Sequence, residues 1–206
     1  MRNDRREPVE LEFSVLQGRF VRLEPVTAGV KEPMRALVES DPGAWQTLTV
    51  NPIIQGFDAY WLPMMKGIER GERYAYAIRR ISDGRVIGTS SFMSMRLAQR
   101  CVEIGATFLH PDARGSFANS ESKLLMLDHA FNRGAVRVEF VVDVENHRSQ
   151  AAVLKLGAAR EGLLRNRKIA WNGEVRDVAI FSLTEREWPG ARSRLCDRLS
   201  AYGASA

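Results

Sequence analysis

The fold of this chain is decided by residues 102–131, VEIGATFLHPDARGSFANSESKLLMLDHAF, and by residues 136–157, VRVEFVVDVENHRSQAAVLKLG. Alternation of apolar and polar residues predicts strands over 101–110 and 136–144. Between them, apolar residues three or four positions apart predict a helix over 119–132. A strand, a crossover helix and a second strand in this order pair the two strands in parallel.

The turn between the first strand and the first helix of this unit carries the sequence RGSFAN, residues 114–119. A turn that leads into a helix N-terminus points backbone N–H groups and the positive end of the helix dipole at one place, which suits a phosphate. We therefore expect a ligand with a pyrophosphate here. The alternative is that RGSFAN only connects a strand to a helix.

The rest of the chain predicts an α+β (mixed α/β) fold. We expect a central mixed, mostly antiparallel twisted sheet of about six or seven strands, with helices on both faces and a C-terminal helix. Asn172-Gly173 is a strong hairpin signal, and Gly157 is a typical end for a helix. The predicted elements are a strand over 19–26, helices over 28–39 and 59–70, strands over 73–80 and 85–97, a helix over 148–156, two strands around Asn172-Gly173 and a helix after Leu183.

We assign residues 1–16 to an N-terminal arm, 17–185 to one domain and 186–206 to a C-terminal helical extension, with 44–56 irregular. The terminal helix has an apolar face that covers the core or pairs with a second subunit in a homodimer. That face comprises Trp188, Leu195 and Leu199.

Composition limits the class of protein. The chain has 206 residues, of which 45% are hydrophobic and 27% charged, as in an ordinary globular domain. No apolar run approaches the roughly 18 residues that span a bilayer, so we expect a cytoplasmic protein without a membrane partner. Cys101 and Cys196 are expected to be free thiols.

The net charge of +5 fits either a nucleic-acid surface or a basic pocket for a polyanionic small molecule. The basic residues are spread along the chain and interleaved with acids, and they form no block of five or more. We therefore expect no nucleic-acid partner. The three histidines lack the spacing of metal ligands, so no metal is expected either.

Three motifs in this order resemble the GCN5-related N-acetyltransferase (GNAT) superfamily, and specifically its ribosomal-protein N-acetyltransferase-like (RimJ/RimL-type) branch. They are LQGRFVRLEPV, FLHPDARGSFANSESKLLMLDHAF and VENHRSQAAVLKLGAAREGLLR. The resemblance covers residues 17–185. It implies acetyl-CoA as the donor and transfer of the acetyl group to an amine.

The resemblance also implies which residues bind coenzyme A. The usual glycine positions of the phosphate turn hold Phe117 and Asn119 here. The ring of Phe117 must therefore point away from the pyrophosphate, whereas Asn119 can cap the helix and Ser120 and Ser122 can donate to phosphate oxygens. The implied cofactor-binding residues are Leu109, His110, Arg114, Gly115, Ser116, Phe117, Ala118, Asn119, Ser120, Asn146 and Ser149.

In the family, the asparagine that matches Asn146 binds the pantetheine arm, and the serine that matches Ser149 lies near the thioester sulfur. The alternative for Asn146 is a helix cap, and both roles are compatible. Many members place a tyrosine, as the acid, where this chain has Val153. Ser149 or a water would then protonate the thiolate, or the thiolate leaves unassisted.

Acetyl transfer needs a base for the amine proton and an N–H group that polarises the carbonyl. Glu103 is the candidate base, because it lies on the strand that leads into the phosphate turn and a half-buried carboxylate there can accept a proton directly or through water. Alternation places Glu103, Gly105 and Thr107 on one face of this strand. The alternative is an ion pair between Glu103 and an arginine. The polarising N–H is expected near Thr107 or Leu109, where the family strand bulges.

The acceptor wall of the family is built from the region that contains four large side chains of this protein, although core packing explains each one as well. These are Trp45, Tyr60, Trp61 and Met64. The acceptor could be a protein N-terminus, an amino acid or a small amine, attacked directly in a ternary complex. The alternative function is a CoA-binding sensor or interaction protein that is catalytically weak or inactive.

Overall fold

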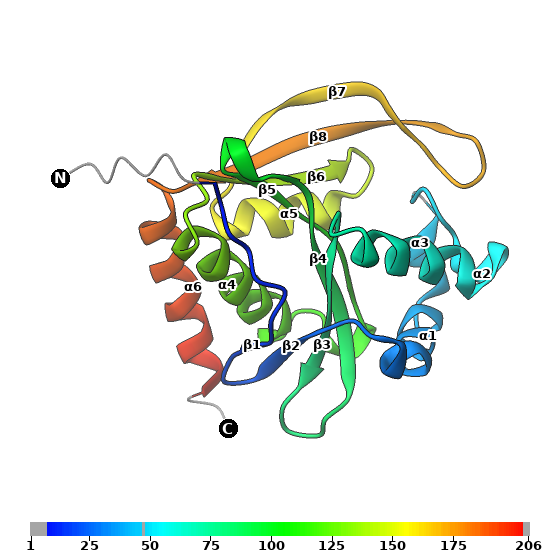
Figure 1. Ribbon diagram of the computed structural model, residues 1–206, viewed down its shortest axis with the longest axis horizontal. Coiled ribbons are helices and arrows are strands. Elements are labelled where there is room, and N and C mark those ends of the chain that lie inside the picture. The colour runs from blue at the N-terminus through cyan, green and yellow to red at the C-terminus, as the bar shows by residue number, and fades with distance from the viewer. Residues whose placement is uncertain (1–7, 47, 204–206) are drawn as a thin grey trace.

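The computed structural model describes residues 8–46 and 48–203, which form an eight-stranded sheet in the order β1-β2-β3-β4-β5-β6-β8-β7 (Figure 1). Only β5 and β6 pair in parallel, and the other neighbouring pairs are antiparallel. The strands are β1 (Leu16–Gln17), β2 (Val21–Pro25), β3 (Tyr74–Arg80), β4 (Val86–Arg96), β5 (Cys101–Leu109), β6 (Arg137–Asp143), β7 (Ala159–Ile169) and β8 (Val175–Thr184).

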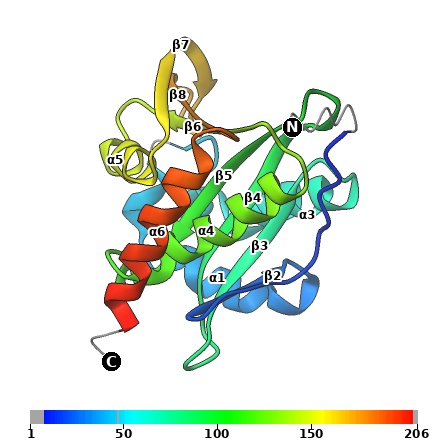
Figure 2. The ribbon, with the colours of Figure 1, turned by 90° about the vertical axis from the view of Figure 1, so that its left-hand side faces the viewer.

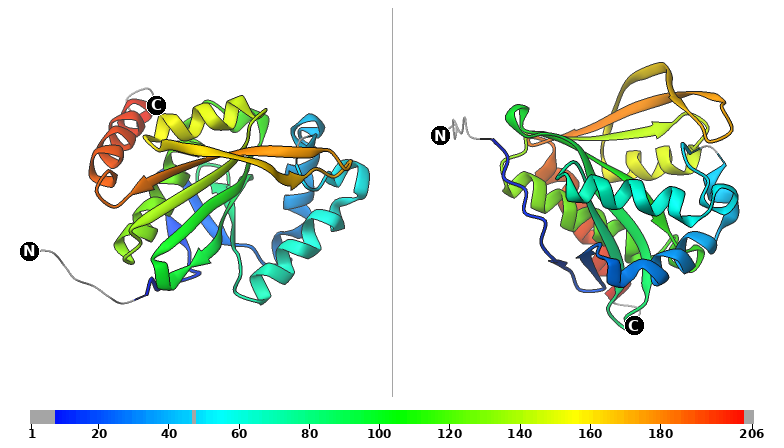
Figure 3. Two further views of the ribbon diagram at one scale, coloured as in Figure 1. Left: turned by 90° about the horizontal axis from the view of Figure 1, so that it is seen from above. Right: turned by 45° about the vertical axis from the view of Figure 1, so that its right-hand side comes forward.

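Helices cover both faces of the sheet, which confirms the predicted fold class (Figure 3). One layer holds α1 (Lys31–Glu39), α2 (Pro52–Gln55) and α3 (Phe57–Glu69). The other holds α4 (Phe117–Asn132), α5 (His147–Leu156) and α6 (Trp188–Gly203). The described residues also contain four short 3-10 turns: η1 (Ala28–Val30), η2 (Pro42–Trp45), η3 (Leu97–Gln99) and η4 (Pro111–Ala113).

The central strands are buried on both faces, as β3 illustrates. Tyr76 and Ile78 lie in the apolar core on the α4 side, while Ala75 and Ala77 lie in the core on the α1 and α3 side. Successive side chains of a strand point to opposite faces. Each central strand therefore contributes to two cores, which fixes the positions of both helix layers.

The N-terminal segment corrects the predicted arm. Val9 and Leu11 are buried in the core on the α4 side, and the Val9 N–H donates to the Leu97 carbonyl at 3.2 Å. Phe13 stacks on Tyr74 with ring centroids 4.9 Å apart. Residues 8–16 therefore belong to the domain, and the remainder of the predicted arm, residues 1–7, lies outside the described residues.

The C-terminal helix is also part of the domain. Figure 2 shows α6 lying along α4, and Trp188 stacks on Phe131 with ring centroids 5.4 Å apart. Leu195 and Leu199 are buried. This apolar face covers the core of its own chain, so it no longer gives a reason to expect a homodimer.

Within the described part of the chain, no helix has both the length and the apolar character to cross a membrane.

The hairpin predicted at Asn172-Gly173 is confirmed by β7 and β8, and its tip reaches the opposite layer. The Trp171 N–H donates to the Leu48 carbonyl at 3.0 Å, and the Trp171 indole donates to the Gln46 carbonyl at 3.2 Å. The segment that the tip contacts leads into α2, which the sequence analysis missed. Asn51 caps α2, and Pro52 occupies its first turn, a position where proline favours a helix.

Candidate functional site

Two parallel strands diverge at the centre of the sheet. β5 pairs with β6 only from Cys101 opposite Arg137 to Glu103 opposite Glu139. β5 then continues to Leu109 and β6 to Asp143 without pairing to each other. We call the divergence of residues 104–109 from 140–143 the splay. The edge of β5 in the splay presents backbone N–H and C=O groups that a ligand can pair with.

A β-bulge in β5 changes the face to which its side chains point. Ala106 has φ +47°, and the pairing register shifts opposite it, between Thr89 and Ser91 of β4. Ile104 lies in the core on the α4 side, whereas Phe108 lies in the core on the α1 and α3 side. A simple alternation would put both residues on the same face.

The bulge therefore corrects one of the predicted faces. Thr107 contacts Lys123 of α4 at 2.6 Å, so its side chain faces α4. Glu103 and Gly105 stay together on the other face, because a Cβ on Gly105 would lie 3.0 Å from the Glu103 Oε1. The prediction was right for Glu103 and Gly105 and wrong for Thr107.

Glu103 lies where the splay begins, in the last residue pair between β5 and β6. It is half-buried, and its Oε2 accepts a hydrogen bond from the Ser94 hydroxyl at 2.8 Å. Across the residues that the structure describes, no arginine forms an ion pair with Glu103; Arg96 and Arg137 pair with Glu139 instead. The carboxylate is therefore unmatched by a cation, and its role as the base stays a prediction.

The phosphate turn ends in a capped helix. Ser116 is the N-cap of α4, since its Oγ accepts from the Ala118 N–H at 3.2 Å and donates to the Ala113 carbonyl at 2.7 Å. Gly115 has φ +73° and adopts the left-handed conformation that favours glycine. The helix begins two residues earlier than predicted, so Asn119 is not the cap and lies half-exposed in the first turn.

The ring of Phe117 packs among aromatic side chains. It stacks on Phe20 with centroids 4.7 Å apart and meets Tyr202 edge-on at 6.2 Å. The Tyr202 hydroxyl donates to the Gly115 carbonyl at 2.9 Å, so the end of α6 is joined to the turn. The large side chain at a usual glycine position is thus accommodated by packing, as the sequence analysis required.

Arg114, an implied cofactor-binding residue, and Ser122, a predicted phosphate donor, are both bonded inside the protein. The Arg114 Nη2 lies 2.6 Å from the Asp41 Oδ2, and its Nε donates to the Leu109 carbonyl at 3.1 Å. Its hydrogen bond to Asp41 lowers the pKa of that carboxyl. Ser122 is fully buried and donates to the Ala118 carbonyl at 2.6 Å. Ser122 therefore cannot serve a phosphate, and Arg114 already has its counter-charge.

His110 and Asn146 lie at the starts of η4 and α5, whereas Ser120 is buried. His110 shapes the turn, because its Nδ1 accepts from the Asp112 N–H at 3.2 Å. The Asn146 Oδ1 accepts from the Ser149 N–H at 3.0 Å, which confirms the helix cap and leaves the amide NH₂ group for a ligand. The contacts of these residues with coenzyme A stay predictions.

Lys123 was missed by the sequence analysis. Only 4% of it is exposed, and its Nζ donates to the Ser90 Oγ at 2.8 Å and to the Thr107 Oγ1 at 2.6 Å. Burial lowers the pKa of Lys123 to about 7. A signal was present in the sequence, because Lys123 occupies a position of α4 in helical register with the buried Leu127 and Ala130.

Arg73 is a second cation beside the bulge, on the other face of the sheet. Its Nε donates to the Ser91 Oγ at 2.9 Å, and burial lowers its pKa. Its Nη2 and the Tyr60 hydroxyl are both buried without a hydrogen-bond partner. Burial raises the pKa of Tyr60, and the charge of Arg73 opposes this rise. Tyr60 is therefore a predicted acceptor residue whose buried hydroxyl is without a hydrogen bond.

The remaining acceptor residues are core residues, which corrects their predicted lining role. Trp45, Trp61 and Met64 are buried between the α1–α3 layer and the sheet. Trp45 stacks on Phe108 with ring centroids 5.0 Å apart. Their side chains support the acceptor side of the sheet, since they fill the space under α1 and α3.

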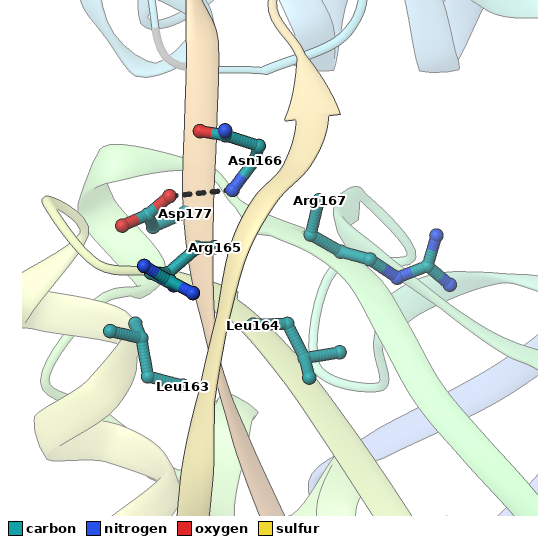
Figure 4. Close-up of a pocket in the computed structure, with 6 residues that line it drawn as sticks. All are labelled: Leu163, Leu164, Arg165, Asn166, Arg167 and Asp177. Carbon is teal, nitrogen blue, oxygen red and sulfur yellow. Dashed lines mark hydrogen bonds between the residues drawn. The ribbon is translucent and has the colours of Figure 1, made fainter.

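An open groove follows the β7–β8 hairpin (Figure 4). Asn166 has φ +52°, and its N–H donates to the Asp177 Oδ1 at 2.7 Å, which marks an irregular pairing of the two strands. Figure 4 shows Arg165 and Arg167 on opposite sides of β7. The groove is built from the hairpin alone and contains none of the predicted site residues. Its lining comprises Leu163, Leu164, Arg165, Asn166, Arg167 and Asp177.

Known proteins share this sequence pattern and this fold. The uncharacterized N-acetyltransferase YoaA of Bacillus subtilis (strain 168) is 30% identical over 118 residues, which cover 57% of this chain and 64%, less than two thirds, of YoaA. A GCN5-related N-acetyltransferase from Brucella melitensis is 26% identical to this chain and has a TM-score of 0.85. The superposition covers 97% of this chain and 90% of that one.

RimJ from Mycobacterium smegmatis, solved in complex with CoA-disulfide, has the same fold, with a TM-score of 0.75, 21% identity and coverage of 93% of this chain and 97% of that one. The family model for the acetyltransferase (GNAT) domain matches residues 21–159, a range that contains the splay, the phosphate turn and α4. The chain therefore belongs to the acetyltransferase (GNAT) domain family.

Proposed function

We propose that this protein is an acetyl-CoA-dependent N-acetyltransferase that moves the acetyl group to a primary amine by direct attack in a ternary complex. One observation supports this above the others. The splayed segment of β5 leads directly, through η4, into the capped N-terminus of α4. A phosphate site and a row of unpaired backbone groups thus lie one after the other along the chain, as a long ligand with a pyrophosphate requires.

The residues present fit coenzyme A at both ends of this path. The first turn of α4 offers backbone N–H groups that the helix itself does not use, and Gly115 adds no side chain there. The Asn146 amide and the backbone edge of residues 104–109 would hold the pantetheine arm. When bound, acetyl-CoA supplies an acetyl group activated as a thioester.

The chain's own residues would move the protons. Glu103 takes a proton from the attacking amine, so that the new C–N bond forms from a neutral nitrogen. A backbone N–H near Thr107 or Leu109 stabilises the oxyanion while the C–S bond breaks. Glu103 lies on the α1–α3 face of the sheet, so the amine approaches from that face.

The acceptor is a protein N-terminus, an amino acid or a small amine. Assignment to the RimJ/RimL-type branch, which favours a peptide N-terminus, is part of the proposal and is supported by motif order. The protein would act in the cytoplasm, with neither nucleic acid nor membrane as a partner.

The test is calorimetric titration of the full chain with acetyl-CoA, with desulfo-CoA and ATP as comparators. Micromolar binding of acetyl-CoA is expected, followed by an acetylated product with a member of a panel of peptides, amino acids and polyamines, detected by mass spectrometry. Absence of acetyl-CoA binding would overturn the proposal.

A second candidate function is a CoA-binding protein without transferase activity. It is favoured by the internal pairing of Arg114 with Asp41 and by Phe117 at a usual glycine position. Tight binding of acetyl-CoA without an acetylated product from any amine would support this candidate instead.

A further inference from the structure

A buried lysine without a carboxylate partner needs an explanation. The Lys123 ammonium is held by two hydroxyl groups, Ser90 Oγ and Thr107 Oγ1, which themselves lie 2.9 Å apart. Among residues 8–46 and 48–203, no acidic side chain forms an ion pair with it. A buried charge without a counter-ion is costly. A methionine of similar size would fill the same space, so packing alone does not account for the amine.

The charged groups of the surrounding elements are occupied elsewhere. On α4, Glu121 accepts the backbone N–H groups of residues 19–21 at the start of β2. Asp128 of α4 pairs with Arg192 of α6. From β4 and β5, hydroxyl groups face the amine, and its pKa is lowered by burial with no charge contributing. The groups that can exchange a proton with the amine are therefore the hydroxyls of Ser90 and Thr107 and not an acidic side chain.

Thr107 connects this amine to the splay. Thr107 is exposed, whereas Lys123 is buried. Thr107 follows the bulge at Ala106, on the part of β5 that does not pair with β6. The bulge turns the Thr107 side chain toward α4, and its Oγ1 lies 2.6 Å from the lysine nitrogen. A proton can therefore pass from Lys123 through one hydroxyl to a group that lies in the splay.

The proposed reaction lacks a proton donor at this place. Loss of the acetyl group leaves a thiolate on coenzyme A, and Val153, where many relatives have a tyrosine, is a buried valine without an acidic proton. Ser149 is held at the start of α5 by its backbone and carries only a hydroxyl, a weak acid.

We propose that Lys123 is the proton source for the departing thiolate of coenzyme A, acting through the Thr107 hydroxyl. As the C–S bond breaks, its electron pair goes to sulfur; Thr107 gives its hydroxyl proton to the sulfur and takes one from the Lys123 ammonium. Lys123 is left neutral and regains a proton from solvent through the same path. This inference rests on the proposed function, because it needs coenzyme A in the splay.

The experiment measures the pH dependence of acetyl transfer to the best acceptor of the panel. Turnover is followed by release of the CoA thiol from pH 6 to 9 in the wild type and in the variants Lys123→Met, Thr107→Val and Thr107→Ser. Because the pKa of Lys123 is about 7, its ammonium group can supply a proton below this pH and is largely lost above it. Lys66→Met, at an exposed lysine of α3, is the matched control.

We expect turnover at pH 6 to be about 10²-fold lower in Lys123→Met and Thr107→Val than in the wild type, Lys66→Met and Thr107→Ser, and this difference to shrink as the pH rises above about 7. Thr107→Val and Thr107→Ser keep the lysine, so they test the path if Lys123→Met folds poorly. Equal turnover in all five proteins at each pH would overturn the role of Lys123 and leave the proposed function intact. A wild type that binds no CoA, or that acetylates no amine, would overturn both.

Discussion

Ser90 and Ser91 are neighbours on β4, yet each accepts a hydrogen bond from a different cation, the buried Lys123 and the half-buried Arg73. The Ser90 Oγ lies 2.8 Å from the Lys123 Nζ, and the Ser91 Oγ lies 2.9 Å from the Arg73 Nε. Because consecutive side chains of a strand point to opposite faces, the two cations lie on opposite sides of the sheet beside the bulge in β5. Neither forms an ion pair with a carboxylate in the part of the chain that the structure describes.

Lys123 should make the stability of the protein depend on pH. The pKa of Lys123 falls from 10.5 to about 7 on folding, so between these values the unfolded chain binds more protons than the folded one. The free energy of unfolding then rises with pH by up to about 1.4 kcal/mol per unit. Lys123→Met has no such group. Near pH 7 we therefore expect Lys123→Met to have the higher free energy of unfolding. The difference between the variant and the wild type, measured by urea unfolding, should shrink as the pH rises from about 7 to about 10.

Lys66→Met serves as the control for this measurement, because Lys66 is exposed on α3. The difference in free energy of unfolding between Lys66→Met and the wild type should be the same at each pH. A constant difference for Lys123→Met as well would show that the lysine keeps its ordinary pKa in the folded protein.

Glu103→Gln should separate catalysis from cofactor binding. The amide cannot accept the amine proton, so turnover of the best acceptor should fall by about 10²–10⁴-fold. Affinity for acetyl-CoA, measured by calorimetry, should stay within about twofold, since Glu103 faces the acceptor side rather than α4. Glu72→Gln changes an exposed glutamate and is the matched control. Full turnover in Glu103→Gln would remove Glu103 as the base.

Glu121 should be a major contributor to stability. It is 4% exposed, and its carboxylate accepts the N–H groups of Arg19, Phe20 and Val21 at 2.7, 2.7 and 2.6 Å. Glu121→Gln places an NH₂ group among these donors, and we expect the free energy of unfolding to fall by about 2–4 kcal/mol. Chemical denaturation measures it, and a loss as small as that of Glu72→Gln would contradict the role.

Gly18 should tolerate no side chain, because Glu121 fills the space. A Cβ at Gly18 would lie 2.5 Å from the Glu121 Cδ, and three hydrogen bonds hold that carboxylate in place. Gly18→Ala should lower the free energy of unfolding by about 1–3 kcal/mol. In the control Gly29→Ala, the nearest heavy atom lies 3.7 Å away. Equal melting temperatures for the two variants would show that the carboxylate moves aside.

Arg73→Met should leave the protein as stable as the wild type or more stable. Partial burial of the Arg73 guanidinium without a carboxylate is unfavourable, and replacement of a buried charge by an apolar side chain is often neutral or stabilising. The midpoint of urea unfolding measures this. A clear loss of stability would mean that the guanidinium is compensated by contacts stronger than its hydrogen bond to Ser91.

The sequence by itself determined the order of the longer elements, although not β1 and α2, and the parallel unit around α4. Alternation identified β6, where Val138, Phe140 and Val142 are buried, and Gly157 and Asn146 marked the two ends of α5. These signals are local, because a strand period, a cap or a hairpin turn depends on residues within a few positions of each other.

Only the tertiary structure decided where the bulge lies and what surrounds it. A bulge depends on the register between β4 and β5, which no single segment specifies, so the face of Thr107 was predicted wrongly. The lowered pKa of Lys123 likewise requires Ser90 and Thr107, 33 and 16 residues distant in the sequence, to meet it in a buried place. Burial is a property of the assembled layers, and it turns an ordinary lysine of α4 into the proposed proton source.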